Sequence, residues 1–167
     1  MLRLLCLSLA GHPQNCLAPE RIRVNVTPLD MNVNDLVFLP ATEIARRIRE
    51  KHISALEVVD SFFQQIERHN AQVNAIVTLD NDCAREWARV ADRAMAYGEI
   101  WGPLHGVPIT VKDALATAGL RTTSSFKPLA GYIPTQNATA VARLRAAGAI
   151  IFGKTNFPQV TNITMGC

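Results

Sequence analysis

The chain has 167 residues, of which 49% are hydrophobic and 19% are charged. These fractions are those of a globular protein, so the disordered, collagen-like and coiled-coil classes are excluded. The 17 basic and 14 acidic side chains leave a formal charge of +3 without a clustered basic stretch, so no nucleic-acid partner is expected.

Residues 1–40 contain four prolines and no sustained hydrophobic period, so they are interpreted as an irregular leader, with Met31 as an alternative start. The longest apolar run, residues 146–153, is well short of the roughly 18 residues that span a bilayer, so no membrane partner is expected. The four cysteines form neither a C-x-x-C pair nor a metal-ligand spacing. This pattern favours free thiols and a cytoplasmic location.

Helices are predicted in the first half of the chain. Residues 41–51 carry isoleucines one turn apart between basic residues that form a solvated face. Ser54 and Glu57 make a capping box, which predicts a helix of about fifteen residues with Phe62 and Phe63 in the core. A short strand is expected over residues 73–79, followed by an alanine-rich helix that ends at Gly98.

The second half predicts a strand, a helix and a second strand. Val107–Val111 is a brief apolar strand, Asn137–Ala147 is a helix stopped by Gly148, and Ala149–Phe152 is typical of a parallel strand buried on both faces. The loop between Lys112 and this helix has about 24 residues, and loops of this length inside compact domains are usually functional. Chemistry is therefore expected in this loop.

Residues 148–155, GAIIFGKT, match the phosphate-binding pattern G-x-x-x-x-G-K-[ST]. The residues between the two glycines form a strand-like AIIF, and Pro158 follows soon after Thr155. A phosphate-binding loop needs flexible backbone amides and a helix directly after it. We therefore interpret this segment as a strand and reject nucleotide binding.

Lys112 is the candidate catalytic residue, because it follows the apolar run VPITV at the C-terminal end of a predicted strand. If the amine is withdrawn from solvent, its pKa falls and it can act as a general base near neutrality. The alternative is a solvated lysine paired with Asp113. His105 is interpreted as a hydrogen-bonded structural residue, and Ser124 and Ser125 as turn formers.

Three strings, GPLHGVPITVKD, AGLRTTSS and NATAVARLRAAGAIIFGKTNFP, resemble the amidase signature family, and the resemblance runs from about Leu39 to Gln159. It implies an α/β fold with a mixed sheet flanked by helices. It also implies hydrolysis of a small-molecule amide by a nucleophilic serine, a bridging serine and a lysine, without a metal or organic cofactor. Lys112 matches the family's lysine.

The chain also departs from the family pattern. Both family serines come downstream of the GKTN motif, and the sequence reaches Cys167 before either of them. Asn137 stands where the family often has Asp, and Gln159 where it often has Glu. We therefore interpret residues 41–159 as the N-terminal part of an amidase domain and residues 160–167 as a divergent, truncated tail, and expect no activity from the chain alone.

Two other interpretations stay open. The chain could be a fragment of the amidase-like component of a tRNA-dependent amidotransferase, which would share these motifs. It could also be a non-catalytic remnant or interaction module that uses the helices of residues 41–98 as a packing surface.

Overall fold

The computed structural model describes residues 36–157. The elements, in chain order, are α2 (Ala41–Arg49), α3 (Ala55–Val73), β1 (Ile76–Leu79), α4 (Asn81–Ala96), β2 (Pro108–Lys112), a 3₁₀ turn (Lys127–Leu129), α5 (Thr139–Ala146) and β3 (Ile150–Thr155). Most of the leader lies outside the described residues, including Met31, as do Gln159 and the divergent tail. None of the described helices is long and apolar enough to cross a membrane.

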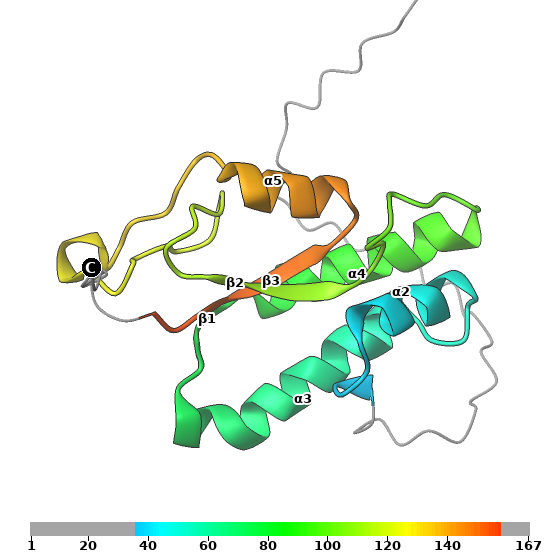
Figure 1. The fold of residues 1–167 in the computed structure, drawn as a ribbon, viewed down its shortest axis with the longest axis horizontal. Helices are drawn as coiled ribbons and strands as arrows, with labels where there is room; N and C mark the ends of the chain where they lie inside the picture. Colours follow the sequence, from blue (N-terminus) through cyan, green and yellow to red (C-terminus); the bar gives the residue numbers. More distant parts are fainter. Residues whose placement is uncertain (1–35, 158–167) are drawn as a thin grey trace, which may run out of the picture.

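The three described strands form one mixed sheet in the order β1-β3-β2. The central strand, β3, pairs antiparallel with β1 and parallel with β2. Helix α5 covers one face of the sheet, and α2, α3 and α4 lie on the other side (Figure 1). The predicted mixed sheet flanked by helices is therefore confirmed.

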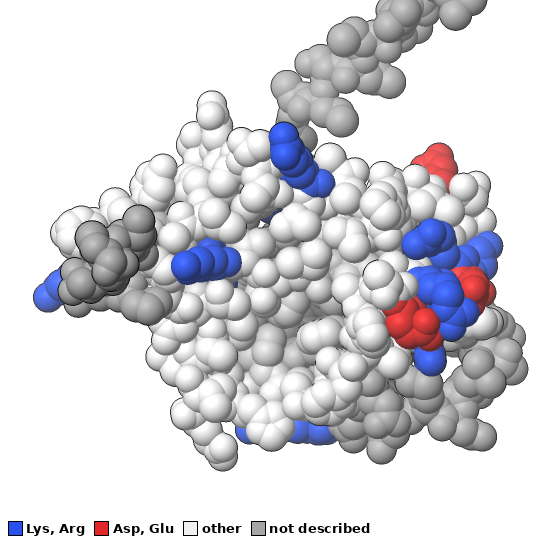
Figure 2. All heavy atoms as spheres, in the orientation of Figure 1, with Lys and Arg blue, Asp and Glu red and all other residues white. Residues whose placement is uncertain are grey.

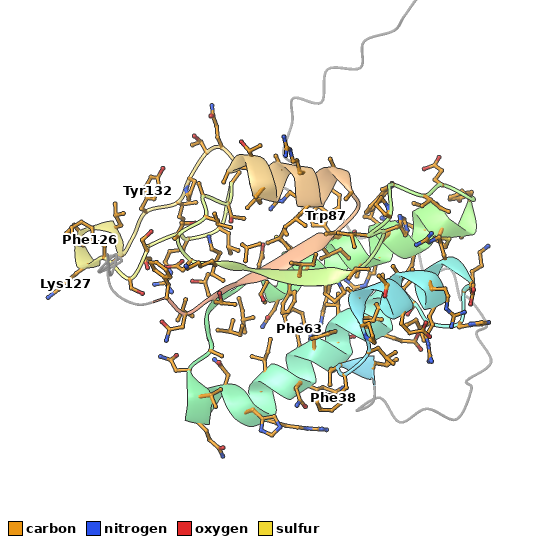
Figure 3. All side chains as sticks on the ribbon, viewed as in Figure 1. Phe38, Phe63, Trp87, Phe126, Lys127 and Tyr132 are labelled. Atoms are coloured by element: carbon orange, nitrogen blue, oxygen red, sulfur yellow. The ribbon has the colours of Figure 1, made fainter. Side chains whose placement is uncertain are left out.

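The side chains of β3 alternate between two cores. Ile150 and Phe152 belong to a large cluster with α2, α3 and α4, while Ile151 packs with Val141 of α5. Phe63 of α3 meets Phe152 edge-on, with ring centroids 5.5 Å apart, and lies in the described core between helix and sheet (Figure 3). Burial on both faces is what the apolar run predicts for a central strand.

Helix α3 begins where the capping box predicts. The Ser54 side chain accepts a hydrogen bond from the Glu57 amide, and the Glu57 carboxylate accepts one from the Ser54 amide. The helix has 19 residues rather than about fifteen, because it continues to Val73 and ends at Asn74 in the left-handed conformation, with φ 48°. The strand predicted from residue 73 therefore starts at Ile76.

The leader contributes to the core at its C-terminal end. Leu36 is buried, and Leu39 packs against the large cluster. The predicted boundary at residue 40 thus leaves two packed leucines on the leader side.

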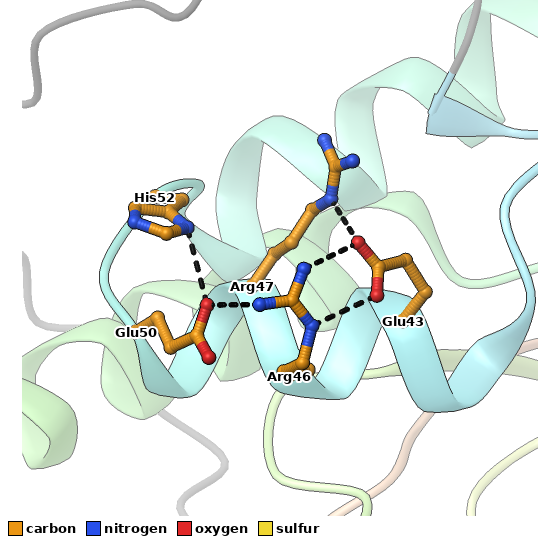
Figure 4. Close-up of polar contacts among 5 residues, drawn as sticks. All are labelled: Glu43, Arg46, Arg47, Glu50 and His52. Atoms are coloured by element: carbon orange, nitrogen blue, oxygen red, sulfur yellow. Dashed lines mark hydrogen bonds and ion pairs between the residues drawn. The ribbon is translucent and has the colours of Figure 1, made fainter.

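Two of the three basic residues of α2, Arg46 and Arg47, are paired with acidic side chains, so they do not form a basic patch. Arg46 binds Glu43 through two nitrogens at 2.8 and 2.9 Å, and it also contacts Glu50 (Figure 4). The hydrogen bonds from Arg46 and Arg47 lower the pKa of Glu43 to about 2. Figure 2 shows this mixed cluster of both signs on the surface in view. Such alternation is typical of a solvated helix face.

Asp92 of α4 joins the two long helices. Its carboxylate accepts hydrogen bonds from the amides of Ala55 at 2.7 Å and Leu56 at 3.2 Å, in the first turn of α3. These amides have no acceptor within their own helix, because the first turn of any α-helix leaves its donors free. Asp92 therefore caps α3 from a neighbouring helix.

We predict that Asp92→Ala lowers the free energy of unfolding by about 1–3 kcal/mol, because it leaves two partly buried donors unpaired. Urea denaturation followed by circular dichroism measures the loss. Glu86→Ala, a change at a more exposed position of α4, is the control and should stay within about 0.5 kcal/mol of the wild type. Equal stability of the Asp92 and Glu86 variants would contradict the capping role.

Candidate active site

Lys112 lies at the C-terminal end of β2 and is exposed. Its amine sits 4.1 Å from the centroid of the Phe157 ring, a cation–π contact. It borders a depression of about 500 Å³, whose lining residues are Lys112, Ala114, Leu115, Ser124, Phe126, Leu129 and Phe157. Lys112 ends a strand, as predicted, and this strand end places the amine at a hollow. Among residues 36–157, no other group encloses the Lys112 side chain enough to withdraw its amine from solvent.

The alternative pairing of Lys112 with Asp113 is wrong. Asp113 is 1% exposed, and its carboxylate accepts hydrogen bonds from the Thr123 amide and hydroxyl. Within residues 36–157, no acidic side chain forms an ion pair with Lys112. β2 ends at Lys112 and Asp113 begins the turn that follows, where its side chain faces Thr123. Asp113 instead joins the start of the long loop to Thr123, ten residues later.

Ser124 and Ser125 are in a turn, as predicted. Both have positive φ, at 50° and 51°, which is uncommon for residues other than glycine. The Ser125 hydroxyl donates a hydrogen bond to the Phe157 carbonyl, and the Ser125 amide donates to the Thr123 hydroxyl at 3.2 Å. Ser124 lines the same depression as Lys112. The turn thus connects the wall of the depression to the residue that lies against the Lys112 amine.

Side chains of the same loop extend the apolar surface beside the depression. Phe126, Leu129 and Tyr132 are 40%, 37% and 49% exposed. Figure 3 shows Phe126 and Tyr132 at the end of the molecule away from α2. The ammonium of Lys112 therefore stands next to a largely apolar surface.

His105 has the structural role predicted for it. It is 2% exposed, and its Nδ1 accepts a hydrogen bond from the Trp101 amide at 3.1 Å. The other ring nitrogen, Nε2, must then carry the proton and donate it to the Ala91 carbonyl at 3.0 Å. Both nitrogens are occupied, so the ring ties the turn before β2 to α4.

The GKT segment is part of β3 and not a phosphate-binding loop. The strand continues to Thr155, three residues beyond the predicted end, and Lys154 pairs with Thr78 of β1 and with Val111 of β2. Its amides are therefore committed to a sheet, and the interpretation of this segment as a strand is confirmed.

Lys154 is the buried lysine of the described chain. Its side chain is 0% exposed, and Nζ donates to the Leu115 carbonyl, to the Thr117 hydroxyl at 3.1 Å and to the Thr122 hydroxyl at 2.8 Å. Each threonine hydroxyl donates its own proton to a loop carbonyl at 3.0 Å, that of Leu115 or Leu120. The hydroxyls can therefore only accept from Lys154, and three acceptors require the three protons of an ammonium.

Burial lowers the pKa of Lys154 to about 8, and the nearby negative charge of Asp113 opposes this effect. The group therefore keeps its charge at neutral pH. Sequence reasoning missed Lys154 as a part of the site. A signal was present, because a lysine at the end of an apolar run that predicts a fully buried strand must find polar partners.

Asn137 links α5 to the loop. Its side-chain oxygen accepts a hydrogen bond from the Ala118 amide at 2.8 Å, and the next residue, Ala138, donates to the Ala116 carbonyl at 2.8 Å. An aspartate, which the family often has here, would offer the same acceptor. The departure at this position therefore preserves the contact.

We predict that Lys154 makes stability depend on pH. Burial lowers its pKa from 10.5 to about 8, so between these values the unfolded state binds more protons than the folded state. The free energy of unfolding should therefore rise with pH across this window. Urea titrations of the wild type and Lys154→Met, below pH 8 and above pH 10.5, measure the difference. The variant should lack the rise, whereas Lys127→Met, which removes an exposed lysine, should keep it.

Comparisons with known proteins agree with the fold and the motifs. The Amidase family model matches residues 57–166. The chain is 44% identical over 125 residues to a glutamyl-tRNA(Gln) amidotransferase subunit of Carboxydothermus hydrogenoformans. It is 41% identical over 129 residues to an acylamidase of Rhodococcus erythropolis. These alignments cover 75% and 77% of the chain.

Solved structures give the same result. The peptide amidase of Stenotrophomonas maltophilia aligns with a TM-score of 0.71 and 29% identity, over 77% of this chain and 27% of that protein. A fatty acid amide hydrolase aligns with a TM-score of 0.72 and 26% identity, over 78% of this chain and 23% of that protein. The chain spans about a quarter of the length of the relatives that it matches, 26% for the first and 27% for the second curated protein. With the family model covering most of its length, the chain belongs to the amidase family.

Proposed function

We propose that Lys112 is the catalytic lysine of an amide hydrolase and that this chain supplies that lysine and its surroundings to an amidase domain. The observation that carries the proposal is the Lys112 amine, which lies at the end of a strand beside a depression, inside the segment that matches the Amidase family. A strand end at a hollow lets a side chain reach a bound molecule while the sheet fixes its backbone.

The chemistry follows from the resemblance to the family. A neutral Lys112 amine takes a proton, relayed through a bridging serine, from a nucleophilic serine that attacks the amide carbonyl. The carbon–nitrogen bond breaks, the leaving ammonia or amine receives the proton, and an acyl-enzyme remains. Water then hydrolyses the acyl-enzyme to the acid. This sequence requires neither a metal nor an organic cofactor.

The exposure of Lys112 fits this proposal because the chain corresponds to only part of the length of its relatives. The chain corresponds to about a quarter of its relatives, and both serines of the family lie downstream of the GKTN motif by the resemblance. The remaining three quarters would cover the depression and remove water from the amine, which favours its neutral form. Ser124 and Ser125 lie upstream of that motif and do not take the serine roles.

The proposed substrate is the amide of a carboxylic acid. The relatives include an acylamidase and a peptide amidase, and the wall of the depression is mainly apolar, with Leu115, Phe126 and Phe157 among its residues. An apolar wall with one amine at its border suits an uncharged amide whose acyl side is hydrophobic. The cytoplasmic location proposed for the protein rests on the spacing of its cysteines alone.

A second candidate is the amidase-like component of a tRNA-dependent amidotransferase. The observation that favours it is the 44% identity to the glutamyl-tRNA(Gln) amidotransferase protein of Carboxydothermus hydrogenoformans. In this alternative, ammonia released at the site passes to a substrate held by a partner protein. The expectation that the protein has no nucleic-acid partner would then not hold. Copurification with partner proteins and tRNA distinguishes it from a free-standing amidase. A folded, inactive chain that binds a defined protein would instead favour the interaction module.

We predict that a serine-directed fluorophosphonate probe leaves this chain unlabelled and labels a version continued through the two family serines. In that version, Lys112→Ala should lower kcat/KM for amide hydrolysis by about a hundredfold to ten-thousandfold, the usual range for loss of a general base. Release of ammonia or amine measures the rate.

Lys127→Ala is the matched control, because Lys127 is exposed on the neighbouring loop and does not line the depression. Its activity should equal that of the unmodified version. Strong labelling of the short chain at Ser124 or Ser125, or full activity of the Lys112 variant, would refute the proposal.

A further inference from the structure

Lys154 has no part in the proposed chemistry, although it is a fully buried charge close to the site. An isolated ammonium in a protein interior is unfavourable by several kcal/mol, so a lysine at a 0% exposed position needs compensating contacts. Among the residues that the structure describes, every hydrogen-bond acceptor of its amine lies in one segment, residues 115–122 of the long loop.

The three acceptors span the loop rather than a single turn. The Leu115 carbonyl and the Thr117 hydroxyl come from its start, and the Thr122 hydroxyl comes from the point where the chain returns toward the sheet. One ammonium therefore holds both arms of the segment against the central strand. Between the arms, Thr117 and Leu120 form an isolated β-bridge, which closes the segment on itself.

The same segment leads directly to the depression. Leu115 lines the depression. Thr123 follows Thr122, which accepts a hydrogen bond from Lys154. The Thr123 amide donates to the carboxylate of Asp113, which is next to Lys112 in the sequence. Two residues later, the Ser125 hydroxyl binds the Phe157 carbonyl. Phe157 in turn carries the ring beneath the Lys112 amine.

We infer that Lys154 is a positioning residue for Lys112: its buried ammonium fixes the loop that holds Phe157 and Ser124 around the amine. This inference rests on the proposed function for its meaning and on the contacts above for its evidence. A role for Lys154 as the base itself is ruled out by the geometry, because its three protons are all committed and its side chain does not reach the depression.

The test follows the position of the Lys112 side chain by NMR in the chain as it exists. The methylene protons next to an amine that lies over an aromatic ring are shifted upfield by the ring current, so the wild type should show this shift at Lys112. Phe157→Leu removes the ring and identifies the signal. Lys154→Met should abolish the upfield shift and accelerate exchange of the Thr123 amide about tenfold or more, relative to amides in α3 and α4.

Thr122→Val provides a second variant that keeps Lys154 and removes one of its acceptors. It should reduce the upfield shift and accelerate the same amide, which keeps the inference testable if Lys154→Met fails to fold. Thr135→Val is the control, since Thr135 is an exposed threonine of the same loop. This variant should leave both signals unchanged.

An unchanged Lys112 shift and an unchanged Thr123 exchange rate in the folded Lys154→Met or Thr122→Val protein would overturn the inference. These NMR measurements need no amide hydrolysis, so they test the positioning role of Lys154 separately from the proposed function. Full amide hydrolysis by the Lys112 variant would refute the proposed function and leave the NMR result standing.

Discussion

The burial of one ammonium, that of Lys154, constrains the architecture around the candidate site. A charged group without water is tolerated only when oxygens replace its hydration shell. In this chain the oxygens belong to the loop after β2, so the loop must fold back over the end of β3 for the strand to occupy the centre of the sheet. The desolvation of one ammonium therefore constrains the path of residues 115–122 of this irregular segment.

The order of the strands brings the loop that binds Lys154 close to Lys112. Because β3 lies between β1 and β2, the loop that covers Lys154 also passes the end of β2, where Lys112 is located. Asp113 strengthens the arrangement, since its buried carboxylate holds the loop at Thr123 and partly offsets the positive charge of Lys154. The loop that satisfies the charge of Lys154 therefore also forms part of the wall of the depression beside Lys112.

The helices and strands could be predicted because their signals are local. The capping box at Ser54 and the glycines after α4 and α5 mark ends that depend on residues a few positions away. The end of β3 could not be predicted in this way. Gly153 and Lys154 have low strand preference, and they are held in the strand by pairing with β1 and β2, which are distant in sequence. Long-range pairing also decides which residues of the loop meet.

The two lysines show the same limit at the site. Each ends an apolar run, VPITVK in one strand and IIFGK in the other, so sequence pattern alone treats them alike. Their surroundings differ because the loop after β2 encloses Lys154, whereas the described residues leave the Lys112 side chain exposed. Lys154 is 0% exposed and bound by three loop oxygens, so it is a structural cation, whereas the exposed Lys112 borders the depression. A general base must exchange protons with a substrate or a relay, so the exposed amine of Lys112 suits the proposed catalytic role, and the buried Lys154 suits the proposed role of holding the loop around that amine.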